Sequence, residues 1–273
     1  MNKNLFVTSL ALLAMSGASL ANASVFDSFV IRDSGGTPPS ILANNAYVPG
    51  ATEFVISASG MKAGLGSNDI NGSTIGDITQ LSITRHDDTT RFTAGSGPAV
   101  APYFNVWVTD GTNYAVIANE PSNPAFQSLF TTNGDGSKTY DLSFADISGT
   151  VAKVYETPGW NTNSSWVHTL FGPDPLTFGD LASLTIAPPP ASYILNAANG
   201  VGSGAPDVFG SHVAYGFNWV FGDTLSNYVS GAEGYVVSDF NAAAASGGAI
   251  PEPGMLTVFG MLTAMGLVAR RRS

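Results

Sequence analysis

Hydrophobic and polar residues alternate along several short stretches of the chain, and this two-residue period is typical of β-strands with one buried face. In residues 103–109 (YFNVWVT), one predicted face carries Phe, Val and Val, and the opposite face carries Asn, Trp and Thr. Asp110-Gly111 follows, and residues 113–119 (NYAVIAN) alternate again. Because Asp-Gly is a favoured turn between paired strands, the pattern predicts a β-hairpin.

The same alternation predicts four further strands, at residues 80–84, 138–144, 181–187 and 214–222. Asn-Gly and Pro-Gly turn signals separate the alternating runs, and no long amphipathic helix interrupts them. The pattern therefore predicts an all-β fold, an antiparallel β-sandwich of the jelly-roll type, over residues 24–240. In the last predicted strand, four aromatic residues fall on one face: Tyr215, Phe217, Trp219 and Phe221.

Composition strengthens the all-β prediction and reduces the classes of binding partner to be expected. The 273 residues include 31 Gly and 16 Pro but only 11% charged residues, which favours short strands joined by tight turns. No cysteine is present, so disulfides, thiolate metal sites and cysteine nucleophiles are excluded. Residues 24–250 contain 19 acidic and 6 basic residues, and such a surface repels phosphate backbones. Nucleic acid is therefore not an expected partner, whereas cations and neutral sugars are compatible with this charge.

The first 23 residues have the pattern of a secretory signal peptide. Lys3 supplies a positive start, and residues 5–13 form an apolar run that is too short to span a bilayer. Ala21 and Ala23 place small residues where signal peptidase inspects the chain, which predicts cleavage before Ser24. The expected partners are the export translocon and signal peptidase.

A second apolar segment, residues 254–269, is uncharged and is followed by three arginines, Arg270, Arg271 and Arg272. As a helix it would rise about 24 Å at about 1.5 Å per residue, slightly less than a hydrocarbon core of about 30 Å. Cytoplasmic arginines next to an apolar helix resist translocation. We expect a single transmembrane helix whose arginines stay inside while the body is exported across the inner membrane.

Pro251, Glu252 and Pro253 precede the apolar segment, and prolines favour an extended backbone on either side of the glutamate. Residues 241–249 (NAAAASGGA) are small and predict a flexible linker before this motif. An extended strip on such a linker suits the cleft of a protease or transpeptidase.

The order Pro-Glu-Pro, apolar helix and arginine cluster resembles the PEP-CTERM sorting signal. The resemblance covers residues 250–273 and implies recognition by an exosortase, a membrane-embedded cysteine enzyme of exopolysaccharide-producing Gram-negative bacteria. It further implies that the tail of residues 250–273 is removed and that the body reaches the cell surface or the extracellular matrix, where exopolysaccharide is a candidate partner.

An aromatic and polar stretch at residues 156–168 predicts a carbohydrate-binding loop through Trp160, Asn161, Asn163 and Trp166. An indole face stacks on the apolar side of a sugar ring, while amides bond to its hydroxyl groups. The alternative is that both tryptophans close the edge of the sandwich as part of its core.

Residues 133–141 (NGDGSKTYD) place four oxygen-bearing side chains at a spacing that is typical of a calcium loop: Asn133, Asp135, Ser137 and Asp141. The glycine and the final glutamate of such a loop are missing from their positions, and a glycine-rich hairpin explains the same residues. In residues 85–91 (RHDDTTR), Asp87 and Asp88 suggest a second cation site together with His86. Two basic neighbours, Arg85 and Arg91, favour a solvated charge cluster instead.

Three histidines lie far apart in the sequence and outside any metalloprotease or serine-hydrolase motif, so no catalytic residue and no cofactor is assigned. We therefore expect a non-enzymatic exported protein that is processed at its tail. A carbohydrate-binding module is the alternative. An exported polysaccharide-acting enzyme would need two facing carboxylates.

Overall fold

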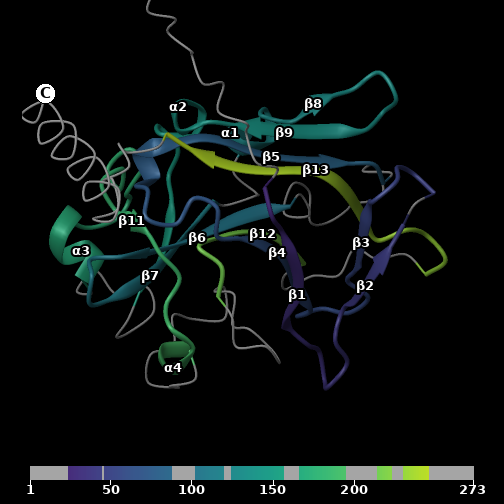
Figure 1. Ribbon diagram of the computed structural model, residues 1–273, viewed down its shortest axis with the longest axis horizontal. Coiled ribbons are helices and arrows are strands. Elements are labelled where there is room, and N and C mark those ends of the chain that lie inside the picture. Colours follow the sequence, from purple (N-terminus) through teal and green to yellow (C-terminus); the bar gives the residue numbers. More distant parts are fainter. Residues whose placement is uncertain are drawn as a thin grey trace, which may run out of the picture.

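The computed structural model describes residues 24–44, 46–87, 102–119, 124–156, 166–194, 214–222 and 230–245, which form two antiparallel β-sheets (Figure 1). The all-β class expected from the alternating pattern is therefore confirmed. The helices in these ranges are short: η1 (Ile75–Asp77), α1 (Pro124–Gln127), α2 (Phe144–Ile147), α3 (Trp166–Phe171) and α4 (Ala191–Ile194).

The first sheet has the strand order β1-β4-β12-β6-β7-β10, and the short β11 pairs with β6 next to the residues that pair with β12. The predicted hairpin is confirmed, because β6 and β7 pair with Thr109 opposite Tyr114. The strands of this sheet are β1 (Asp27–Arg32), β4 (Lys62–Ser67), β6 (Tyr103–Thr109), β7 (Tyr114–Ala118), β10 (Lys153–Glu156), β11 (Thr185–Ile186) and β12 (Phe217–Phe221).

The second sheet has the strand order β2-β3-β13-β5-β9-β8. The chain crosses repeatedly between the sheets, for example from β3 to β4, from β4 to β5 and from β12 to β13 (Figure 1). The strands of this sheet are β2 (Ser40–Ala43), β3 (Thr52–Val55), β5 (Ile78–Arg85), β8 (Thr131–Thr132), β9 (Lys138–Leu142) and β13 (Tyr235–Ala244).

The linker predicted for residues 241–249 is wrong over its first four residues. β13 continues to Ala244, and its last residues pair with β5 from Ser82 to Ile78. Alanine is a weak strand former, but backbone pairing with a central strand overrides that local preference. Residues 246–249 lie outside the described ranges.

Aromatic side chains from both sheets form the main core between them. The Phe54 and Phe221 rings stack with their centroids 4.2 Å apart, and the Tyr140 and Trp219 rings stack at 5.9 Å. Each pair joins one strand of the second sheet to β12 of the first sheet. Stacked rings at these distances add to the free energy gained from burying apolar area.

The central strands of the first sheet are buried on both faces, which the alternating pattern did not predict. Every residue of β4 and β12 is buried, as is β6 as far as Val108. On the outer face, Trp107 packs with Val116 and Ala214. Tyr215 lies on this outer face as well, with its ring 5.3 Å from that of Phe29, so the prediction that it shares the face of the other three aromatics is wrong.

One capping arrangement recurs three times, at Thr74–Asp77, Ser143–Asp146 and Thr177–Asp180. In each, the aspartate accepts hydrogen bonds from both the backbone N–H and the hydroxyl of the Ser or Thr three residues earlier. The third copy leads into turns up to Ser183, so the strand predicted for residues 181–187 is reduced to β11.

Candidate functional site

The residues predicted for export and sorting lie mostly outside the described ranges. These are Ala21 and Ala23 of the signal peptide, the motif Pro251, Glu252 and Pro253, and the cluster Arg270, Arg271 and Arg272. Among the described ranges, none of the helices combines the length and apolar character that a bilayer crossing requires.

Ser24, the predicted first residue after signal cleavage, is the first described residue and is fixed to the sandwich. Its hydroxyl donates to Asn241 Oδ1 at 2.5 Å and accepts from the Ala242 N–H at 3.1 Å. Two residues later, the Phe26 ring packs against the Phe217 and Phe240 rings. The start of the predicted body is thus bound to β13, its last strand.

The segment predicted as a calcium loop forms the hairpin between β8 and β9. Asn133 Nδ2 donates to the hydroxyls of Ser137 and Thr139, and Asp135 accepts the N–H and hydroxyl of Ser137. Those Ser137 hydrogen bonds hold the pKa of Asp135 below its usual range. Asp141 lies further along β9, where it accepts a hydrogen bond from Gln80. The hairpin therefore closes on its own hydrogen bonds, and the calcium site stays a prediction.

Arg85 and Asp87 form a buried ion pair, whereas the sequence favoured a solvated charge cluster. Arg85 Nη2 lies 2.7 Å from Asp87 Oδ2, and both side chains are almost completely buried. Asp87 Oδ1 also accepts the Val236 N–H, and the Arg85 guanidinium lies over the Tyr235 ring. This arrangement joins β5 to β13. In the described part of the chain, His, Asp and Glu side chains nowhere gather in a group of three that could hold a metal ion.

Of the predicted carbohydrate-binding loop, Trp160, Asn161 and Asn163 lie outside the described ranges, and Trp166 begins α3. Its side chain is half-buried against the main core, and its indole Nε1–H donates to the Tyr114 carbonyl at 3.2 Å. Because its one hydrogen-bond donor is already used, Trp166 acts here as an anchor that holds α3 to the start of β7.

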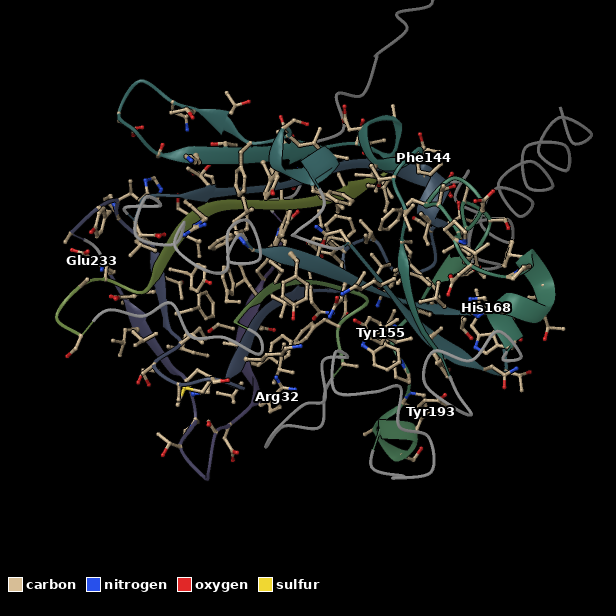
Figure 2. The ribbon with its side chains drawn as sticks, turned by 180° about the vertical axis from the view of Figure 1, so that it is seen from behind. Arg32, Phe144, Tyr155, His168, Tyr193 and Glu233 are labelled. Atoms are coloured by element: carbon tan, nitrogen blue, oxygen red, sulfur yellow. The ribbon has the colours of Figure 1, made fainter. Side chains whose placement is uncertain are left out.

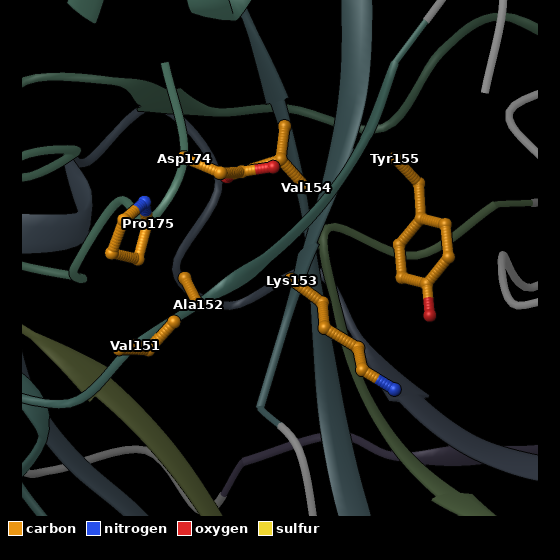
Figure 3. A pocket seen from close by; sticks show the side chains of 7 residues that line it. All are labelled: Val151, Ala152, Lys153, Val154, Tyr155, Asp174 and Pro175. Atoms are coloured by element: carbon orange, nitrogen blue, oxygen red, sulfur yellow. The ribbon is translucent and has the colours of Figure 1, made fainter. Parts of the chain in front are cut away.

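His168 lies on the buried side of α3, with Nε2 3.2 Å from Asp174 Oδ1. Figure 2 shows it at the opposite end of the molecule from Glu233. Asp174 and Pro175 border a pocket of about 400 Å³ beside β10. In Figure 3, Lys153 and Tyr155 project to one side of β10, away from Asp174.

A larger groove, of about 580 Å³, lies where α3 meets the β6–β7 turn. Three segments line it: residues 109–111, residues 170–171 and residues 183–185. The β6–β11 pairing holds the first and third side by side, because Thr109 lies opposite Thr185. The bond from Trp166 to β7 fixes α3, which carries the second.

The turn that forms one wall of this groove is held by its own hydrogen bonds and carries a negative charge. Asp110 Oδ1 accepts the N–H groups of Thr112 and Asn113, and Oδ2 accepts the Asn113 amide at 3.0 Å. Partial burial pushes the pKa of Asp110 upward, but the hydrogen bonds from Asn113 and Thr112 outweigh it and lower that pKa below its usual range. Thr109 Oγ1 donates to the Asn113 carbonyl and accepts the Gly111 N–H.

The opposite wall is apolar. Leu170 is 61% exposed, while Phe171 packs partly against the core. Gly172 follows with φ of 97° and donates to the His168 carbonyl, which ends α3 directly after this pair. The sequence pattern did not identify this groove, because its three walls are far apart along the chain. The one local signal is the apolar pair Leu170-Phe171 directly before Gly172-Pro173, shortly after the stretch predicted to bind carbohydrate.

Comparison of the chain with protein-family models, curated proteins and solved structures gives no match. The geometry and the sequence motifs are therefore the basis for assigning a function.

Proposed function

We propose that this chain is an exported protein whose tail is processed by an exosortase-like enzyme, so that the body reaches the cell surface or the extracellular matrix. The observation that carries the proposal is the ordered tail: Pro251-Glu252-Pro253, the uncharged segment 254–269 and Arg270–Arg272. Partitioning of the apolar segment into lipid would hold the motif at the outer face of the membrane, because the arginines resist translocation.

The contacts of Ser24 and β13 support this division of the chain. Ser24 and Phe26 pack on β13 and its neighbours, so removal of residues 1–23 would leave those contacts intact. β13 ends at Ala244, which leaves residues 245–249 to connect the sheet to the motif. A processing enzyme would therefore meet a segment that begins where the pairing of the sheet ends.

The test is to express the full chain in an exosortase-containing host and to replace Pro251-Glu252-Pro253 by three alanines. We expect the parent chain to lose the mass of its tail and leave the membrane fraction, while the alanine variant keeps its tail. Gly134→Ala, in an exposed hairpin, is the control and should be processed normally. Equal mass and location in hosts with and without the enzyme would contradict the proposal.

We also propose the jelly-roll topology for the body. Its support is the arrangement of eight strands, of which four have the order β3-β13-β5-β9 in one sheet and four have the order β4-β12-β6-β7 in the other. In this order the last two strands, β12 and β13, each insert between two earlier strands. That insertion is what two interlocked Greek keys require, and lectin domains are among the proteins built this way.

The second candidate function is carbohydrate binding, and the groove between α3 and the β6–β7 turn favours it. One wall is apolar and the other is polar, as a sugar ring requires. We assign the body a binding role and not a catalytic one. Three of its aspartates, Asp110, Asp135 and Asp146, each hold a turn by local hydrogen bonds, which is a structural role. A glycan array probed with the full chain tests this function, and absence of binding to every glycan would remove it.

A further inference from the structure

We propose that the groove formed by residues 109–111, 170–171 and 183–185 binds a neutral oligosaccharide, with Leu170 as the main apolar contact. The proposal rests on the carbohydrate-binding function above, and it is independent of the sorting tail. It places the ligand beside α3, whereas the sequence pattern suggested the loop before this helix.

Leu170 provides the first argument. At 61% exposure it is one of the most exposed large hydrophobic side chains among the described residues, although its neighbours Phe171 and Leu184 pack against or within the core. Covering it in a groove removes apolar surface from water, at about 25 cal/mol for each Å². The C–H face of a sugar ring is a surface that can cover it without burying a hydroxyl group.

The polar wall provides the second argument, because it has unused hydrogen-bonding capacity. A carboxylate has about four acceptor positions, and Asp110 uses three of them for Thr112 and Asn113. Its Oδ2 therefore retains one position for a ligand hydroxyl. The hydroxyls of Ser183 and Thr185 make no hydrogen bond with any group in the described part of the chain. Together they offer donors and acceptors at fixed places.

The charge of the groove selects among sugars. Among the described residues that line it, Asp110 is the single ionisable one and none is basic. A uronic acid would bring its carboxylate towards that of Asp110, and like charges repel in a partly desolvated groove. The volume of about 580 Å³ lies in the usual range for small-ligand sites. Neutral hexose units therefore fit the site best.

The test measures binding of the full chain to neutral hexose tetrasaccharides and to uronic-acid tetrasaccharides. Leu170→Ala should weaken binding of the neutral ligand about fivefold to tenfold, since about one kcal/mol of contact is lost. Leu42→Ala is the matched control, because Leu42 is 50% exposed on β2 of the other sheet. Ser183→Ala should give a smaller loss, of about threefold.

Each result of this test has one meaning. Loss in Leu170→Ala but not in Leu42→Ala, with both variants melting like the parent chain, supports the site. Equal affinity of the parent and Leu170→Ala overturns the site and leaves carbohydrate binding elsewhere on the body. Preference for the uronic-acid ligand overturns the choice of neutral sugars. Absence of binding by the parent chain to both tetrasaccharides overturns the site, and the glycan array then decides the carbohydrate function.

Discussion

The two sheets of the sandwich differ in how deeply they are buried, although their sequences alternate alike. In the first sheet, β4 and β12 are buried along their whole length. In the second sheet, the central strands β5 and β13 keep several exposed or half-buried positions, and the edge strand β2 is largely exposed. An alternating pattern therefore describes the polarity of the two faces of a strand, and it does not say that the polar face is in water.

The outer face of the first sheet shows how polar residues are tolerated there. Asn105 and Asn218 lie opposite each other on β6 and β12, and both are fully buried. Two apolar clusters flank this amide pair, one around Tyr103 and the other around Trp107. Asn218 Nδ2 donates to the Tyr215 carbonyl, whereas its Oδ1 accepts no hydrogen bond from any group in the described part of the chain. The second sheet instead presents its polar ladder, Gln80 with Asp141, to solvent.

The largest contrast should come from truncating one buried side chain of the first sheet and one exposed side chain of the second sheet. Trp219→Ala removes a fully buried indole that contacts Phe104, Tyr140 and Phe217, and it should cost about 3–5 kcal/mol of unfolding free energy. Leu42→Ala, on the exposed strand β2, should cost less than about 0.5 kcal/mol. Urea unfolding measures both losses, provided that the slope of unfolding free energy against urea concentration is the same for the variants and the parent chain. Similar losses for the two variants would remove the contrast.

A second comparison tests whether the outer face of the first sheet is truly filled. Gly66 lies under the Tyr215 ring, and an added Cβ would collide with Cγ and Cβ of that residue. Gly66→Ala should therefore cost about 1–3 kcal/mol through overpacking. Gly134→Ala, in the β8–β9 hairpin, meets no atom and should change stability little. If the Gly66→Ala variant melted at the same temperature as the parent chain, Tyr215 would not be held over Gly66.

The amide groups on the first sheet offer a finer comparison. Asn119 Oδ1 accepts the buried Phe104 N–H at 2.6 Å, so Asn119→Leu leaves that donor unsatisfied and should cost about 1–3 kcal/mol. Asn218→Leu removes an oxygen that has no partner among the described residues. This offsets the loss of the hydrogen bond from Asn218 Nδ2 to the Tyr215 carbonyl, so the unfolding free energy should change by less than about 1 kcal/mol. Chemical unfolding measures the loss of unfolding free energy in both variants. A larger loss in Asn218→Leu than in Asn119→Leu would contradict the assigned contacts.

The smallest effect concerns the surface caps and depends on pH. Hydrogen bonds from the Ser143 hydroxyl and N–H lower the pKa of Asp146, and Thr74 and Thr177 do the same for Asp77 and Asp180. Because the folded pKa values are depressed, the caps contribute fully above the unfolded value of about 3.9 and lose their contribution as pH falls below it.

Melting temperatures between pH 5 and pH 2 measure this loss. Ser143→Ala should lower stability by about 1 kcal/mol at pH 7 and should make the acid-induced decline shallower. An unchanged pH profile in this variant would show that Asp146 does not act through Ser143.

The sequence predicted the fold where local pattern and long-range packing agree. The hairpin around Asp110-Gly111 formed as expected, because its turn residues and both strands are contiguous. The strand expected at residues 181–187 was mostly lost, because the cap at Thr177 and Asp180 directs the chain into turns. Trp166 is predicted to bind sugar, but it is half-buried, and the exposed hydrophobic residue of its helix is Leu170. Single-residue type does not reveal which side of a short helix meets the sheet.

By itself, the sequence determined the all-β class, five of the strands (β5, β6, β7, β9 and β12) and the ordered motifs of the tail, because strand period, turn chemistry and lipid partitioning are local properties of the chain. Only the tertiary structure decided that the central strands of the first sheet are covered on both faces, that Arg85 and Asp87 pair in the interior, and that three distant segments meet beside Leu170. These features depend on which surfaces of separate strands come together. That choice is made by burial of the whole core and is not encoded within any one segment.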